Sequence, residues 1–105
     1  MNGITIDQAR DHIGEGITLR GWLYNKRSSG KILFLQIRDG TGTIQGVITE
    51  PEKPDLFSQA AGLPRETSLI VTGRLREEGR APSGCELDIE DISIVQEPTD
   101  PFPIE

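Results

Sequence analysis

Three side chains in the middle of the sequence could together bind one nucleobase: Arg27, Phe34 and Gln45. A phenyl ring exposed on a sheet is a platform for a base, and stacking contributes roughly 1–3 kcal/mol per base. Glutamine carries both a donor and an acceptor, so it can read a Watson–Crick edge. Arginine can pair with a phosphate or a base carbonyl. The alternative is that Phe34 closes one end of a barrel and Gln45 is an ordinary surface residue of a strand.

The segments that carry Phe34 and Gln45 have the alternating pattern of a β-hairpin. In "KILFLQIRD" (31–39) the leucines and the second isoleucine share one face, which leaves Phe34 on the other face among polar and basic neighbours. "DGTG" (39–42) predicts a tight turn, because glycine tolerates positive φ. In the returning strand "TIQGVIT" (43–49), Gln45 and Val47 share the face opposite Ile44 and Ile48. Both residues of interest are therefore predicted on the outer face.

Three further strands are predicted from the same kind of alternation. "ITLRGWLYNKRS" (17–28) precedes the hairpin, with Ile17, Leu19, Gly21 and Leu23 on one face. "SLIVTGRLREE" (68–78) and "CELDIEDISIVQ" (85–96) follow it, joined by a loop over 79–84 that is rich in glycine and proline. The alternation of the last strand slips between Ile89 and Ile92, which predicts a bulge near Glu90–Asp91.

Two short helices accompany these strands. The first follows an N-cap at Thr5 or Asp7 and stops at Gly14. The second covers roughly 55–62, with Asp55 as a possible cap, and ends at Gly62–Leu63–Pro64.

Strand order predicts an all-β fold, a five-stranded OB-fold barrel with a short helix between strands 3 and 4 and a short N-terminal helix. In that fold the face of strands 2 and 3 and the loops 1–2 and 4–5 bind oligonucleotides. The barrel domain is predicted over 1–97, and the segment 98–105 reads as a proline-rich exit linker.

The charge of −6 is unevenly distributed. Residues 1–80 hold all 11 lysines and arginines against 10 acids, whereas residues 81–105 hold 7 acids and no base. Between Gly16 and Arg38 there are five bases and no acid, which favours contact with a phosphate backbone. The alternative is a solvated surface with an acidic tail.

The single cysteine, Cys85, excludes a disulfide framework and a cysteine-based metal site within the chain, which suits a reducing compartment. No apolar run approaches 18 residues and no signal-like segment opens the sequence, so we expect a cytoplasmic protein without a membrane span.

The sequence resembles the N-terminal anticodon-binding domain of class IIb aminoacyl-tRNA synthetases over nearly its whole length. The matching motifs are "GW", "NKRSSGKILFLQIRDGTGTIQGVI", "VTGRL", "RAPSGCEL" and "PFPI". Within that family, "YNKRSSGKI" is most similar to the asparaginyl enzymes. The aspartyl enzymes come next, although Ser28 stands where their bacterial members tend to have aspartate.

The resemblance implies a role for each candidate residue. Phe34 would stack on the central anticodon uridine, and Gln45 and Arg27 would hydrogen-bond its edge. Lys26 and Lys31 would belong to a basic arc along the RNA backbone. The loop "RAPSGCE" resembles the family loop that approaches the other anticodon bases, with the RNA-binding candidates Arg80, Pro82, Gly84 and Glu86. Cys85 receives no role.

The resemblance also implies what the chain lacks. No catalytic residue, metal site or cofactor is expected in it, and ATP and magnesium would belong to a catalytic domain of the same enzyme. The partners would be a tRNA anticodon stem-loop and that catalytic domain, and the parent enzyme would be a homodimeric asparagine–tRNA ligase.

Three functions remain open from the sequence. The first is anticodon recognition within an asparaginyl enzyme, or within an aspartyl enzyme that either discriminates or does not discriminate between the two tRNAs. The second is a stand-alone OB module that binds tRNA or single-stranded nucleic acid without specificity. The third is a barrel for protein interaction or dimerisation.

Overall fold

The computed structural model describes residues 2–81 and 84–96. Pro82, residue 97 and the linker predicted over 98–105 lie outside the described residues. The elements, in chain order, are β1 (Asn2–Ile4), η1 (Ile6–His12, a 3-10 helix), β2 (Gly16–Ser29), β3 (Ile32–Arg38), β4 (Thr43–Thr49), α1 (Pro54–Ala61), β5 (Ser68–Glu77) and β6 (Cys85–Gln96).

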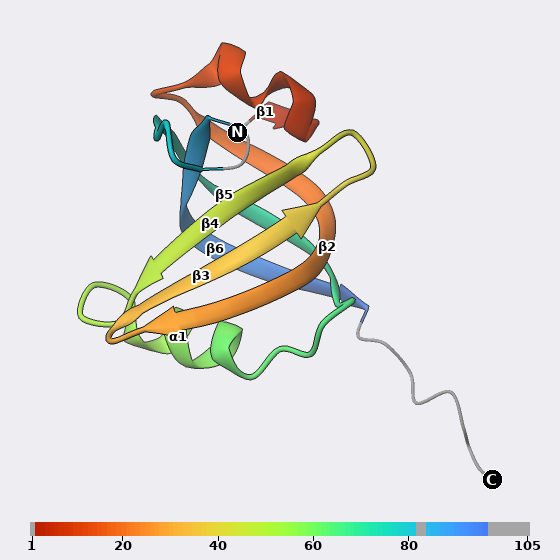
Figure 1. Cartoon of the computed structure of the whole chain (residues 1–105). Helices are drawn as coiled ribbons and strands as arrows, with labels where there is room; N and C mark the ends of the chain where they lie inside the picture. The colour runs from red at the N-terminus through yellow and green to blue at the C-terminus, as the bar shows by residue number, and fades with distance from the viewer. Residues whose placement is uncertain (1, 82–83, 97–105) are drawn as a thin grey trace, which may run out of the picture.

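Strands β2 to β6 close into a barrel (Figure 1). The strand order is β1-β2-β3-β4-β6-β5, and β5 pairs again with β2 to complete the ring. β2 is long enough to pair with two strands: residues 16–22 pair with β5, and residues 22–29 pair with β3. All of these pairings are antiparallel except β4–β6 and the β1–β2 edge. The predicted five-stranded OB-fold barrel is confirmed.

Strand β1 was not predicted from the sequence. It has three residues and pairs in parallel with residues 17–19 of β2. A segment this short cannot show an alternating pattern, so only the tertiary pairing reveals it.

The barrel interior is formed by the apolar face of each strand, as the alternation predicts. Leu33, Leu35 and Ile37 on β3 are all buried, at 3% exposure or less. In β5 the inward positions include Gly73, where a Cβ atom would collide with the backbone carbonyl of Asp88. The predicted bulge is confirmed at Glu90, since Thr72 pairs with Asp91 and Gly73 with Ile89.

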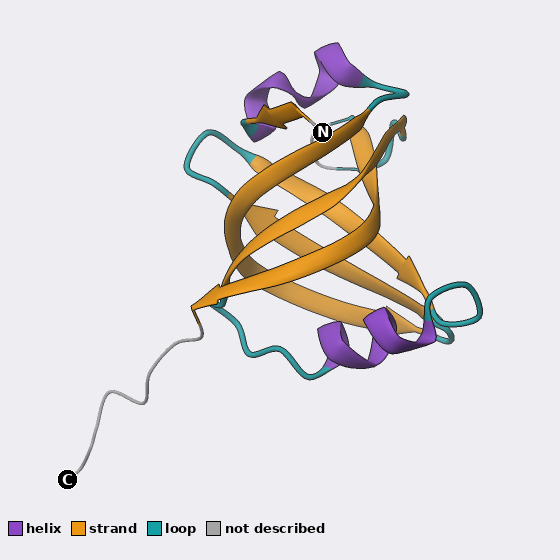
Figure 2. Cartoon of the chain, turned by 180° about the vertical axis from the view of Figure 1, so that it is seen from behind, coloured by secondary structure: helices purple, strands orange, loops and turns teal. Residues whose placement is uncertain are grey.

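The two helices cover opposite ends of the barrel (Figure 2). At η1 the N-cap is Thr5 rather than Asp7, and the backbone N–H of Thr5 donates to Gln8 Oε1 at 3.2 Å. At α1 the expectation of an Asp55 cap is wrong, because the helix starts at Pro54 with Lys53 in the N-cap position. Asp55 lies in the first turn, where a carboxylate is favourable to the helix dipole.

Candidate nucleic-acid interface

Phe34 lies on the outer face of the barrel and lines a cavity of about 340 Å³. This Phe34 cavity brings together residues from four strands and from the β5–β6 loop. Five of the nine RNA-binding candidates are among its lining residues, which are Arg27, Phe34, Gln45, Glu78, Arg80, Ala81 and Glu86. Val47 of β4 is paired with Phe34 and is buried at 5% exposure, so the ring has an apolar neighbour on one side.

Arg27 reaches the Phe34 cavity because β2 contains a bulge. Strict alternation would place Arg27 on the same face as the buried Leu23. Instead Leu23 pairs with Ile37 and Asn25 with Gln36, so Tyr24 is the extra residue. After the bulge Arg27 pairs with Phe34, and its guanidinium carbon lies 4.4 Å from the centre of the phenyl ring. The planar cation therefore stacks beside the aromatic platform.

Gln45 belongs to a row of polar side chains that are cross-strand neighbours. Gln36 donates from Nε2 to Gln45 Oε1 at 3.0 Å, and Gln45 donates from Nε2 to Glu86 Oε2 at 2.6 Å. Arg76 donates to the other carboxylate oxygen of Glu86 at 2.7 Å. Glu86 is only 6% exposed, so its charge is compensated within this row. Gln36 and Arg76 were not predicted from the sequence as site residues.

The β5–β6 loop forms the rim of the Phe34 cavity. Arg80 is almost fully exposed, and its Nε lies 3.7 Å from Glu78 Oε2. Gly84 has a φ of 79°, a conformation that favours glycine, and its carbonyl accepts from the backbone N–H of Glu78 at 3.1 Å. A Cβ atom at Gly84 would lie 3.4 Å from Nη1 of Arg10, so the loop passes close to η1. Gly84 therefore shapes the loop, and Arg80 supplies an accessible charge.

Lys26 and Lys31 do not line the Phe34 cavity. Because of the bulge, Lys26 pairs with the buried Leu35, and its ammonium donates to the carbonyl of Ala61 at the end of α1. A second α1 carbonyl, that of Ala60, lies 3.5 Å away. Lys31 is exposed at the β2–β3 turn. Lys26 thus has a structural partner, whereas Lys31 is accessible.

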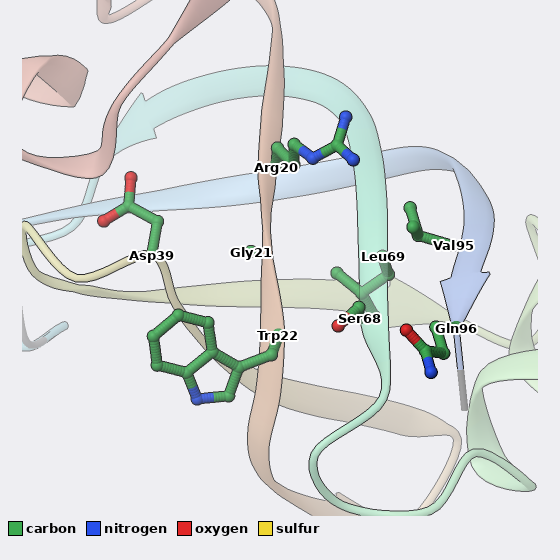
Figure 3. Close-up of a pocket in the computed structure, with 8 residues that line it drawn as sticks. All are labelled: Arg20, Gly21, Trp22, Asp39, Ser68, Leu69, Val95 and Gln96. Carbon is green, nitrogen blue, oxygen red and sulfur yellow. The ribbon is translucent and has the colours of Figure 1, made fainter. Parts of the chain in front are cut away.

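A second cavity, of about 380 Å³, contains none of the candidate residues (Figure 3). It lies where β2, β5 and β6 meet, and its lining residues are Arg20, Gly21, Trp22, Asp39, Ser68, Leu69, Val95 and Gln96. Trp22 and Arg20 come from the same strand as Arg27, but before the bulge.

Asp39 links the β3–β4 turn to the start of η1. Its carboxylate accepts from the backbone N–H of Ile6 at 2.7 Å and from the N–H and hydroxyl of Thr41 at 2.8 and 2.7 Å. Burial alone would raise the pKa of Asp39, but the hydrogen bonds from Thr41, Ile6 and Gly42 lower this pKa below its usual value of 3.8. Asp39 is therefore a structural residue of the turn, as its position in "DGTG" predicts.

Within residues 2–81 and 84–96, no cluster of three or more histidine, cysteine, aspartate or glutamate side chains could hold a metal ion. The same part of the chain contains no helix with the length and apolarity needed to cross a membrane. Cys85 is fully buried at the start of β6, where it packs in the hydrophobic core.

Comparison with known proteins shows the family. The profile of the tRNA anticodon family, an OB-fold nucleic acid binding domain, matches residues 17–95. The asparagine–tRNA ligase of Thermus thermophilus is 46% identical over 102 residues, which cover 96% of this chain and 23% of that protein. The enzyme of the same name from Koribacter versatilis is 46% identical over 103 residues, with 95% and 23% covered.

Among solved structures, the asparaginyl-tRNA synthetase of Pyrococcus horikoshii complexed with asparaginyl-adenylate superposes with a TM-score of 0.80 at 34% identity. The match covers 97% of this chain and 24% of that one. The chain thus spans about a quarter of the length of these relatives. The family profile covers the barrel from residue 17 of β2 to residue 95 of β6, including every described residue of the Phe34 cavity, and the chain belongs to the tRNA anticodon family of OB-fold nucleic acid binding domains.

Proposed function

We propose that this chain is the anticodon-binding domain of an asparagine–tRNA ligase and that the Phe34 cavity holds the central uridine of the anticodon. The relatives from Thermus thermophilus, Koribacter versatilis and Pelotomaculum thermopropionicum, 45–46% identical over nearly the whole chain, are asparagine–tRNA ligases, which supports the asparaginyl over the aspartyl assignment. The remainder of the parent enzyme would bind ATP, magnesium and asparagine, form the homodimer and carry out ligation in the cytoplasm.

The observation that carries this proposal is the convergence of Arg27, Phe34 and Gln45 on one cavity. The phenyl ring offers a stacking surface and the guanidinium offers several donors in one plane. Gln45 adds hydrogen-bonding groups from the neighbouring cross-strand row, where it is paired with Gln36 and Glu86. A cavity of about 340 Å³ is at the lower end of the range for ligand pockets, which suits a single base.

Gln45 keeps enough hydrogen-bonding capacity for a base. Its amide oxygen has two acceptor positions, and Gln36 uses one; its NH2 group has two donors, and Glu86 uses one. One donor and one acceptor position are left over. A uracil presents an N–H between two carbonyls, so one such pair on Gln45 can form two hydrogen bonds with it.

The electrostatic part of binding would come from the accessible bases around the cavity. Arg27, Lys31 and Arg80 are exposed and lie on the β2–β3 hairpin or on the β5–β6 loop. These positive charges would contact phosphates on either side of the unstacked base. Binding should therefore weaken as salt is raised.

The direct test compares the affinity of the chain for stem-loop RNAs that have uridine or another base at the centre of the loop. We expect a preference for uridine, and we expect Phe34→Ala to reduce binding by about 1–3 kcal/mol, or roughly 5- to 150-fold. Ile32→Ala is the control, because Ile32 is also exposed on β3 but does not line the Phe34 cavity.

Other outcomes separate the alternative functions. Equal binding to any single strand would favour a non-specific OB module. Self-association without RNA binding would favour a protein-interaction barrel. Equal affinity of Phe34→Ala and the unaltered chain for the uridine stem-loop would contradict the proposed site.

A further inference from the structure

We infer that Glu86, positioned by Arg76, fixes the direction of the Gln45 amide, and that this direction makes the Phe34 cavity accept uridine and reject cytidine. The inference rests on the proposed function, because it concerns how the same cavity chooses between two pyrimidines. The Glu86 carboxylate would thus control specificity through Gln45, without a hydrogen bond of its own to the base.

The hydrogen bonds in the row of polar side chains converge on Glu86 from both sides. Arg76 and Gln45 each donate to one oxygen of Glu86, at 2.7 and 2.6 Å. Gln36 then donates to Gln45 at 3.0 Å. The register explains the contacts, since Gln36 is paired with Gln45, Gln45 with Glu86 and Glu86 with Arg76 on successive strands.

Glu86 determines the direction of the Gln45 amide because an ionised carboxylate can only accept hydrogen bonds. Gln45 must therefore turn its NH2 group towards Glu86 and its oxygen towards Gln36. Gln36 must in turn present its own NH2 group to that oxygen. An amide without such a neighbour could rotate by half a turn at little cost, because its oxygen and nitrogen are almost the same size.

The direction matters because the two pyrimidines have different edges. The Watson–Crick edge of uracil is an acceptor, a donor and an acceptor in that order. An amide, with one donor and one acceptor, can therefore pair with N3–H and either carbonyl, so uracil matches the amide in either direction once the base moves by one position. The edge of cytosine reads acceptor, acceptor, donor, so it matches an amide in one direction only. Because the proposed site prefers uridine, the direction fixed by Glu86 is the one that fits uracil and places the Gln45 oxygen against the ring nitrogen of cytosine.

Arg76 makes the substitution Glu86→Gln informative. The arginine has only donors, so it should take the oxygen of the new amide and turn the new NH2 group towards Gln45. Gln45 and then Gln36 would have to reverse to satisfy their hydrogen bonds. The side chain at position 86 keeps its size, so the buried site should remain packed.

The experiment measures the affinity of the chain for two stem-loop RNAs that differ only in having uridine or cytidine at the centre of the loop. In the unaltered chain we expect uridine to be preferred by about 1–3 kcal/mol, or roughly 5- to 150-fold, the usual value of one two-bonded contact. In Glu86→Gln we expect this ratio to fall towards one, mainly because cytidine binds more tightly. Glu90→Gln is the control, since it removes the same charge from an exposed position of β6.

The failures can be told apart. If the unaltered chain has no preference for uridine, the proposed function itself is wrong. If it prefers uridine and Glu86→Gln keeps the same ratio, only the role of Glu86 is overturned. A second measurement needs no RNA: the NMR signals of the Gln45 NH2 group should move in Glu86→Gln but not in Glu90→Gln, and unchanged signals would overturn the inference.

Discussion

The guanidinium carbon of Arg27 lies 4.4 Å from the centre of the Phe34 ring, in direct pairing across β2 and β3. This contact exists because the bulge at Tyr24 moves the end of β2 by one residue, which turns Arg27 outward and Lys26 towards α1. One irregular residue thus places Arg27 in the Phe34 cavity and Lys26 against the end of α1.

The first prediction concerns the shape of the Arg27 cation. Arg27→Lys keeps the charge but removes the planar group that stacks on Phe34 and can form two parallel hydrogen bonds. We expect affinity for the uridine stem-loop to fall by about 1–2 kcal/mol, or roughly 5- to 30-fold, in fluorescence anisotropy titrations. Arg20→Lys, on the same strand before the bulge, should bind like the unaltered chain. No loss of affinity in Arg27→Lys would show that only the charge of Arg27 matters, and equal losses in both variants would contradict a specific role for the contact between Arg27 and Phe34.

The second prediction concerns Lys26, which we expect to stabilise the fold more than it binds RNA. Its ammonium bonds to carbonyls of Ala60 and Ala61 at the carboxyl end of α1, where a positive charge is favourable. Lys26→Met should lower the free energy of unfolding by about 0.3–1 kcal/mol, measured by urea denaturation. The control Lys31→Met removes an exposed lysine from the same hairpin and should leave the stability unchanged. Equal stability of the two variants would contradict this role.

The third prediction concerns the pH dependence that Asp39 gives to the fold. Because the pKa of Asp39 is lowered in the folded chain, its stabilising effect is complete above the unfolded pKa near 3.8 and is lost as the pH falls through the lower folded value. Asp39→Asn should cost about 1 kcal/mol at neutral pH, since the carboxylate is only partly buried.

The measurement for Asp39 is the free energy of unfolding at neutral pH and at a pH well below 3.8. The difference between Asp39→Asn and the unaltered chain should shrink at the acidic pH, where the carboxylate is protonated in both states. Asp11→Asn, at an exposed position of η1, is the control and should have the same free energy of unfolding as the unaltered chain at both pH values. A difference that stays constant with pH would refute the assignment.

Local sequence patterns predicted the barrel and the outward position of Phe34. Alternation along β3 placed Phe34 outside, and the slip between Ile89 and Ile92 located the bulge at Glu90. These features were predictable because they depend on which face of one strand is apolar, and that information is contained within a few neighbouring residues.

Features that depend on pairing between distant strands were not predictable. The contact of Gln45 with Glu86 joins residues 41 positions apart through the parallel β4–β6 pairing. No local pattern marks Arg76 as its partner, and an exposed arginine on a strand is ordinary. The bulge at Tyr24 was also not predicted, because "LYNKR" contains too few apolar residues to show that the strand changes face.

The central claim is that one base, the central uridine of the loop, stacks on Phe34 next to Gln45. The most direct measurement is NMR of the chain bound to the uridine stem-loop, with selectively labelled phenylalanine and uridine. If the uridine stacks on Phe34, nuclear Overhauser contacts should appear between the Phe34 ring protons and H5 and H6 of the central uridine, and the Gln45 NH2 signals should shift. Binding that shifts the residues of the second cavity, which includes Trp22, with no contact between Phe34 and the base, would contradict this stacking.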